Sequence, residues 1–185
     1  MEVKLTLGEL WNGWEQLDPS PTDVGTVDMI VRRPQTEERE EVEQAEFDTK
    51  EGLIGDNWLA RGSSSTPDGS AHPEAQITLM NSRVIQLIAG DEPRWDLAGD
   101  QLFVDFDLSM DNLPAGSRIQ IGDVIMEISQ KPHTGCDKFA RSYGAYARKF
   151  VMTDKGKQLR LRGVNAQVIQ GGTINKNDKI EKVTS

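Results

Sequence analysis

The stretch Arg118-Ile-Gln-Ile-Gly-Asp-Val-Ile-Met-Glu-Ile128 decides the fold class. Apolar residues largely alternate with polar ones on both sides of Gly122-Asp123, and this dipeptide is typical of a hairpin turn. The pattern predicts two antiparallel strands, 118–121 and 124–128, each with one face against a core.

Other short apolar runs surround this hairpin, and most of them end at Gly, Pro or Asp. They predict strands over 24–33, 76–80, 102–108, 165–169, 173–174 and 180–183. A weak alternation over 2–7 predicts an edge strand. Asn81 is expected to cap a helix over 82–89. Short strands with Gly and Asp turns, and only two principal helices, predict a mainly β, barrel-like domain with a few attached helices.

Length and composition restrict the class of protein. A chain of 185 residues can bury one substantial core, and no internal repeat or long linker divides it. We therefore expect a single domain over 1–185 with its core over about 20–183. No apolar run is long enough to span a bilayer and no signal-peptide pattern is present, so a cytoplasmic protein without membrane association is expected. A single cysteine cannot form an internal disulfide, which is typical of a reducing compartment.

The charge is distributed unevenly. A net charge of -9 argues against nucleic acid as a partner. Between Lys131 and Arg162, however, nine Lys and Arg stand against two Asp. This segment predicts a small anion such as phosphate as a ligand, and the open alternative is a solvated basic helix face that pairs with acidic loops. The acidic run 37–46 is expected to be a hydrated surface segment without a catalytic role.

The segment Lys131-Pro-His-Thr-Gly-Cys136 contains the only cysteine and leads into the strongest predicted helix. Its Pro and Gly predict a turn that places the thiol at the start of that helix. Asp137 is expected to cap the helix. Four apolar residues at helical spacing then predict one apolar helix face, made of Phe139, Tyr143, Ala147 and Phe150.

This placement favours a reactive thiol at Cys136. A helix N-terminus is the positive end of the helix dipole, and it stabilises the thiolate, which is the reactive form of cysteine. Lys131, His133 and Lys138 add positive charge, whereas Asp137 opposes it. The alternative is an inert apolar residue, since many lone cysteines are buried. The polar Gly and Pro turn favours the functional interpretation.

Several pieces of the sequence occur in an order that is specific as a combination. They are Gly55-Asp-Asn-Trp58, Gln76-Ile-Thr-Leu-Met-Asn-Ser-Arg83, Ala98-Gly-Asp-Gln-Leu102, Leu113-Pro-Ala-Gly-Ser-Arg-Ile-Gln-Ile-Gly122, Lys131-Pro-His-Thr-Gly-Cys136, Arg162-Gly-Val-Asn-Ala-Gln-Val168 and Gly171-Gly-Thr-Ile174. The combination resembles the MOSC domain, the C-terminal domain of molybdenum cofactor sulfurases, and its stand-alone bacterial relatives. The resemblance implies a mainly β fold with a cysteine, here Cys136, that carries sulfur or ligates molybdenum.

The resemblance also implies a cofactor, an activity and partners. The cofactor is the molybdenum cofactor, molybdopterin, and the activity is that of a sulfur transferase or of a molybdenum-dependent oxidoreductase that reduces N-hydroxylated compounds. The implied partners are a cysteine desulfurase or a molybdoenzyme. Pyridoxal phosphate is associated with the family only through a desulfurase domain, which this sequence does not contain.

The candidate site residues follow from both arguments. Cys136 is the expected metal ligand and, with His133, the expected catalytic residue. The pterin phosphate needs cations, and the candidates for it are Arg61, Lys138, Arg141 and Arg162. For each of these cations the alternative is a surface ion pair.

Three other functions stay open from the sequence. Cys136 and His133 are a nucleophile and a base for a hydrolase or transferase, provided that they lie within hydrogen-bond reach. His72, His133 and Cys136 are potential zinc ligands, although their spacing matches no zinc motif. A non-enzymatic module that delivers sulfur or cofactor to a partner protein uses the same cysteine.

Overall fold

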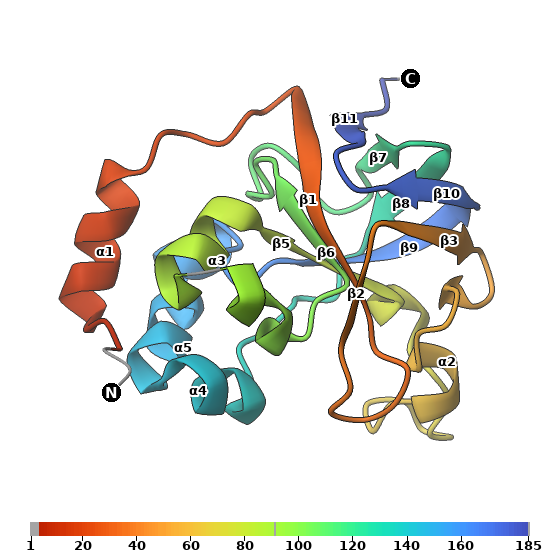
Figure 1. Cartoon of the computed structure of the whole chain (residues 1–185), viewed down its shortest axis with the longest axis horizontal. Helices are drawn as coiled ribbons and strands as arrows, with labels where there is room; N and C mark the ends of the chain where they lie inside the picture. The colour runs from red at the N-terminus through yellow and green to blue at the C-terminus, as the bar shows by residue number, and fades with distance from the viewer. Residues whose placement is uncertain (1–3, 91, 185) are drawn as a thin grey trace.

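The computed structural model describes residues 4–90 and 92–184 (Figure 1). Within these residues seven strands form a closed barrel, because β11 pairs with both β7 and β1. In order around the barrel they are β1 (Val24–Arg32), β6 (Leu102–Asp105), β5 (Ile77–Asn81), β9 (Val164–Gln170), β8 (Val124–Ile128), β7 (Arg118–Ile121) and β11 (Lys179–Lys182). Neighbouring strands are antiparallel except β5 and β6, which are parallel. The barrel confirms the predicted mainly β fold.

Shorter strands extend this barrel. β2 (Glu40–Val42) pairs with the end of β1 and continues the sheet beyond the closed part. β3 (Gln44–Asp48) pairs with β4 (Gly52–Leu53) and with β10 (Gly172–Asn175) to form a second, three-stranded sheet. The acidic run 37–46 therefore lies partly in β2 and β3 and partly in the turn before them.

Most of the longer helices cover one side of the barrel, and α2 lies on the other side (Figure 1). Four of them share an apolar cluster with the barrel wall, and they are α1 (Leu7–Gln16), α3 (Ser82–Ala89), α4 (Asp137–Tyr143) and α5 (Ala145–Met152). A separate cluster fills the barrel interior. The remaining helical segments are α2 (Trp58–Arg61), α6 (Asp154–Gln158), η1 (Pro73–Ala75) and η2 (Glu92–Ala98). None of the helices described has the length and apolar character required to cross a membrane.

Local sequence signals are confirmed at the hairpin and at α3. The strands β7 and β8 have the predicted bounds and are paired in antiparallel register. α3 begins at Ser82, where the Asn81 side chain accepts hydrogen bonds from the backbone N–H groups of Arg83 and Val84. Gly90 ends this helix with a φ of 75°.

Two predictions about helices are wrong. The helix after the cysteine is divided into α4 and α5 by Gly144, whose φ of 97° interrupts the helical backbone. Asp137 is not the cap, because Cys136 occupies the N-cap position and the Asp137 carboxylate pairs with Arg148 at 2.7 Å.

The predicted edge strand over 2–7 is also wrong for the part that the structure describes, and residues 2–3 lie outside it. α1 begins at Leu7 behind a capping box. The Thr6 hydroxyl accepts from the Glu9 backbone N–H, and the Glu9 carboxylate accepts from the Thr6 backbone N–H at 2.8 Å.

Candidate functional site

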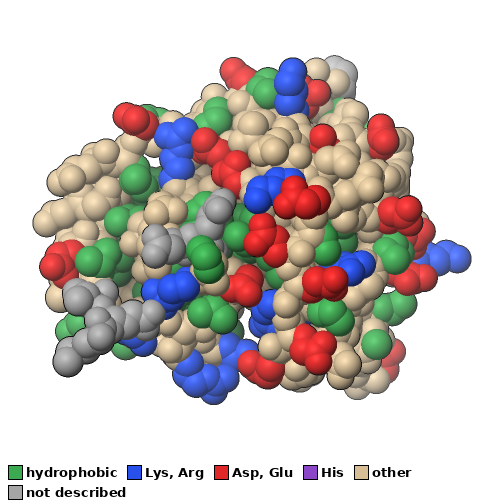
Figure 2. Space-filling view, in the orientation of Figure 1, with side chains coloured by type: hydrophobic (Ala, Val, Ile, Leu, Met, Phe, Trp, Pro, Cys, Tyr) green, Lys and Arg blue, Asp and Glu red, His purple; other side chains and the backbone are tan. Residues whose placement is uncertain are grey.

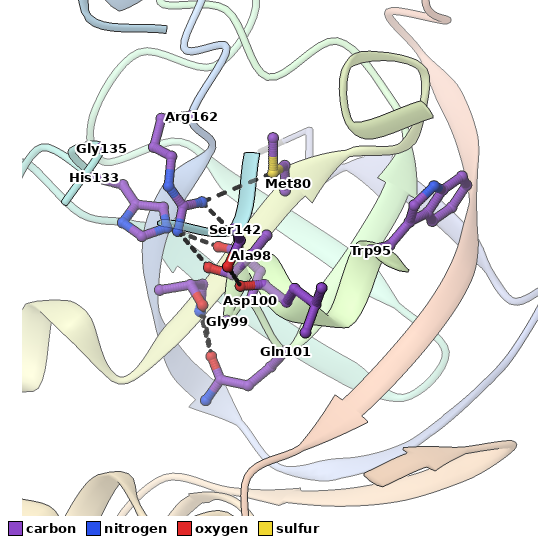
Figure 3. Close-up of polar contacts among 12 residues, drawn as sticks. Met80, Trp95, Ala98, Gly99, Asp100, Gln101, His133, Gly135, Ser142 and Arg162 are labelled. Atoms are coloured by element: carbon purple, nitrogen blue, oxygen red, sulfur yellow. Dashed lines mark hydrogen bonds and ion pairs between the residues drawn. The ribbon is translucent and has the colours of Figure 1, made fainter. Parts of the chain in front are cut away.

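A buried carboxylate joins two residues that are far apart in the sequence (Figure 3). Asp100 follows η2 and Gly99, and none of its side chain is exposed. Its Oδ1 lies 2.7 Å from Nε2 of His133, and its Oδ2 accepts from Nη1 of Arg162 at 2.6 Å. Two residues that were predicted from the sequence, His133 and Arg162, thus meet at a residue that was not.

The charges in this cluster determine its protonation. Burial by itself raises the pKa of Asp100, but the positive charge of Arg162 and the contact with His133 outweigh it and lower the pKa to about 2. Burial and the neighbouring Arg162 lower the pKa of His133, and Asp100 opposes them only in part. Near neutral pH, Asp100 is therefore ionised and His133 is neutral. An ionised carboxylate only accepts hydrogen bonds, so His133 carries its proton on Nε2 and has a lone pair on Nδ1.

Arg162 holds three parts of the chain together. Its Nη2 donates to the carbonyl oxygen of Ala98 at 2.8 Å, and its guanidinium lies over the ring of Phe139, 4.8 Å from the centroid. Arg162 therefore fixes the end of η2 and the first turn of α4 against β9. Because its terminal nitrogens are already bonded, a phosphate at Arg162 would have to compete with Asp100.

A second buried ion pair stabilises the neighbouring loop. Arg33 Nη2 lies 2.7 Å from Asp56 Oδ2, and Arg33 Nη1 donates to the carbonyl oxygen of Gly99 at 3.1 Å. Gln101 Nε2 donates to the same carboxylate at 3.3 Å. The Gly55-Asp-Asn-Trp58 turn and the segment that carries Asp100 are thus parts of one polar network.

Cys136 lies at the surface, at the first turn of α4. The loop before it is fixed by the backbone of Gly135, whose N–H donates to Sδ of Met152 at 3.1 Å and whose carbonyl accepts from Arg148 Nε at 3.2 Å. Among the described residues no hydrogen bond joins Cys136 to His133, and Nε2 of His133 is directed to Asp100. The arrangement does not show the contact that a Cys–His catalytic pair needs.

A small groove beside α4 contains two of the predicted cations. Its volume is about 100 Å³, and it is lined by Glu37, Arg39, Leu97, Lys138, Arg141 and Ser142. Lys138 Nζ lies 2.7 Å from Glu37 Oε1, and both side chains are largely exposed. Figure 2 shows Lys and Arg side chains next to acidic ones at this edge of the molecule.

Arg61 is exposed at the end of α2, outside this groove. Partial burial of its side chain and the positive charge of Arg33 lower its pKa, and Asp56 opposes them. Arg61 is therefore close to the second buried ion pair rather than to Asp100.

The predicted zinc ligands are not gathered into a site. His72 caps η1, where its Nδ1 accepts from the Glu74 backbone N–H at 3.2 Å. In residues 4–90 and 92–184, no three side chains of His, Cys, Asp or Glu are grouped as metal ligands.

A family model described as the MOSC domain matches residues 66–181, which is more than half of the chain. The chain belongs to the MOSC domain family. The MOSC match includes Asp100, His133, Cys136 and Arg162, whereas Arg61 precedes it. Membership relates the chain to proteins associated with the molybdenum cofactor.

Solved structures support the same fold. The YUAD protein of Bacillus subtilis has a TM-score of 0.63 at 15% identity, over 88% of this chain and 97% of that chain. YiiM of Escherichia coli has a TM-score of 0.56 at 18% identity, over 86% and 70%. YiiM of Geobacillus stearothermophilus has a TM-score of 0.54 at 14% identity, over 90% and 76%. A comparison with curated protein sequences gave no match.

Proposed function

We propose that this MOSC domain acts on the molybdenum cofactor or its sulfur through the thiol of Cys136. The observation that carries the proposal is the position of this thiol. It is exposed, it forms no disulfide, and it stands at the N-cap of α4. The loop that precedes it is held by the hydrogen bonds of His133 and Arg162 to Asp100. A nucleophile or ligand on a rigid loop is held in a defined position for its partner.

The residues around Cys136 fit the cofactor that the family implies. A thiolate is a soft ligand suited to the molybdenum of this cofactor. Arg39, Lys138 and Arg141 line the neighbouring groove, and their charges suit the phosphate of a pterin. Lys138 would exchange its exposed contact with Glu37 for this phosphate, and Arg61 is a more distant contributor. When bound, the molybdenum cofactor would supply two-electron redox chemistry.

We assign His133 and Arg162 positioning roles. Each donates one hydrogen bond to the buried Asp100 carboxylate, and together they hold the loop 131–136 against the start of β9. In this arrangement His133 does not deprotonate Cys136.

The sulfur step requires no additional oxidant. The Cys136 thiolate attacks the outer sulfur of a persulfide on a cysteine desulfurase. The new S–S bond forms on Cys136, the S–S bond of the donor breaks, and the donor cysteine leaves as a thiolate. Electrons and atoms balance, and the product is a persulfide on Cys136.

The second candidate is a non-enzymatic carrier that passes sulfur or cofactor to a molybdoenzyme. The exposure of Cys136 favours it, because a carrier must present its sulfur to another protein. Turnover separates the two candidates. Cofactor-loaded protein that repeatedly reduces an N-hydroxylated amidine in the presence of an electron donor is an oxidoreductase, whereas a carrier delivers once per loading.

Cofactor binding tests the proposal. The protein is produced in a host that makes the molybdenum cofactor, and the pterin is released, oxidised and measured by fluorescence. We expect Cys136→Ser to lose most of the pterin. Lys138→Gln/Arg141→Gln should retain less pterin than the control Lys149→Gln, which removes an exposed charge on α5, outside the groove. Equal pterin and equal sulfur acceptance in wild type and Cys136→Ser would refute the proposal.

A further inference from the structure

A cavity on the other side of the loop 131–136 is separate from the exposed thiol. Its volume is about 280 Å³. It lies between this loop, the segment from α5 to α6 and the start of β9, and its lining does not include Cys136. The cavity is thus distinct from the groove that contains Lys138 and Arg141.

The charge of this cavity is opposite to that of the whole chain. Four cationic side chains line it, namely Lys131, Lys157, Arg160 and Arg162, and no Asp or Glu does. In the part of the chain that the structure describes, no hydrogen bond or ion pair engages the ammonium group of Lys131 or of Lys157. In a protein of net charge -9, a concave surface with unpaired cations favours an anion.

The remaining wall is mostly apolar. Its apolar side chains are Met110, Pro132, Val151, Met152 and Val164, and the polar residues Ser129, Gln130, Thr134 and Asn165 lie among them. Nη1 of Arg160 is already engaged, because it donates to the carbonyl oxygens of Leu108 and Leu113. An occupant therefore needs an apolar body as well as a negative charge. A small organic carboxylate has both, and inorganic phosphate lacks the apolar body.

Polar atoms at the inner wall require a further group on the ligand. Nε2 of the His133 ring is bonded to Asp100, and a Cβ built on Gly163 would lie 3.3 Å from Cδ2 of the ring. These neighbours lie along one edge of the ring, and Nδ1 lies on the other. Nδ1 has a lone pair and no partner among the described residues, so it accepts a donor. Arg162 lies on the same wall, and its buried Nε has no hydrogen-bond partner in the described chain. A buried and unpartnered group such as this Nε is costly unless a ligand or a water satisfies it.

We infer that this cavity binds a small carboxylate with an apolar body and a hydroxyl or N–H donor. Lys131 and Lys157 pair with the carboxylate, the apolar wall contacts the body, and His133 Nδ1 accepts a hydrogen bond from the donor. This inference does not rest on the function proposed for Cys136. It adds a second ligand site to the fold.

Calorimetric titration with 4-hydroxybenzoate tests the site. We expect saturable binding that is about tenfold or more weaker in Lys131→Gln/Lys157→Gln, because charge-assisted hydrogen bonds are lost. Lys149→Gln removes a charge outside the cavity and should bind like wild type. The uncharged 4-hydroxybenzamide should not saturate, and benzoate, which lacks the donor, should bind more weakly than 4-hydroxybenzoate.

Two further measurements show where 4-hydroxybenzoate binds and whether its binding depends on Cys136. In amide NMR spectra, 4-hydroxybenzoate should shift the signals of Lys131, His133, Thr134 and residues 162–165. Cys136→Ser should bind it with unchanged affinity. No saturable binding by wild type would overturn the inference. Equal affinity in Lys131→Gln/Lys157→Gln and Lys149→Gln, or shifts confined to the groove beside α4, would overturn it as well.

Discussion

Replacing Asp100 by Asn removes the buried negative charge that holds His133 and Arg162. The folded pKa of about 2 lies below the ordinary value of 3.8, and this difference corresponds to about 2 kcal/mol of unfolding free energy at neutral pH. The variant also leaves the buried guanidinium of Arg162 without its counter-charge. We expect a total loss of about 3 kcal/mol, within the range for a broken buried pair.

The stability that Asp100→Asn loses relative to wild type should become smaller as the pH falls. Asp100 has a depressed folded pKa, so its contribution is complete above about pH 5 and is lost progressively as the pH falls towards 2. The difference in unfolding free energy between wild type and Asp100→Asn should therefore narrow by roughly 1 kcal/mol between pH 7 and pH 3. Urea unfolding followed by tryptophan fluorescence at several pH values measures it.

Asp137→Asn is the matched control. The Asp137 carboxylate also pairs with an arginine, Arg148, but 84% of its side chain is exposed. Exposed ion pairs contribute little, so this variant should lose less than about 1 kcal/mol. If Asp100→Asn is as stable as Asp137→Asn, or if its deficit is the same at pH 7 and pH 3, the reasoning about the buried carboxylate is refuted.

Three further predictions concern the same scaffold. By NMR, His133 should titrate below 6.5 in wild type and at a higher pH in Arg162→Met, since the guanidinium lowers its pKa; an unchanged midpoint contradicts this. Gly163→Ala should lower the unfolding free energy in urea by at least about 2 kcal/mol, because its φ is 106° and the new Cβ meets a backbone carbonyl oxygen of β5. The control Gly116→Ala has a φ of 88° and open space around the new Cβ, so it should lose about 1 kcal/mol. Equal losses would exclude the steric argument. Thr6→Ala should cost about 1 kcal/mol through the lost cap of α1, and an unchanged midpoint in thermal unfolding would count against the cap.

Local patterns predicted much of the fold. The turn at Gly122-Asp123 and the cap at Asn81 each act on neighbouring residues, so short windows of sequence are sufficient to identify β7, β8 and α3. The capping box of α1 was missed, because the weak alternation over 2–7 was interpreted as an edge strand, although Thr6 and Glu9 have the required spacing. Gly144 was not recognised as a break, because the apolar residues on both sides of it keep helical spacing.

The site was predictable only in part. The turn before Cys136 correctly indicated a cysteine at the start of a helix. Asp100 was missed although it lies in a run that resembles the family, because its partners are 33 and 62 residues away in the sequence. Nothing local distinguishes a buried aspartate next to a glycine from a turn residue. The unpaired lysines of the cavity likewise become neighbours only through the packing of α5 and α6 against the loop 131–136.

Intact mass spectrometry after incubation with a cysteine desulfurase and cysteine measures sulfur transfer to Cys136 most directly. We expect wild type to gain the mass of one sulfur atom, a thiol reductant to remove it, and Cys136→Ser to gain none. Asp137→Asn, next to the thiol, should accept sulfur like wild type. An adduct of the same mass on Cys136→Ser, or none on wild-type protein that also binds no pterin, would contradict the assignment of Cys136 as the reacting group.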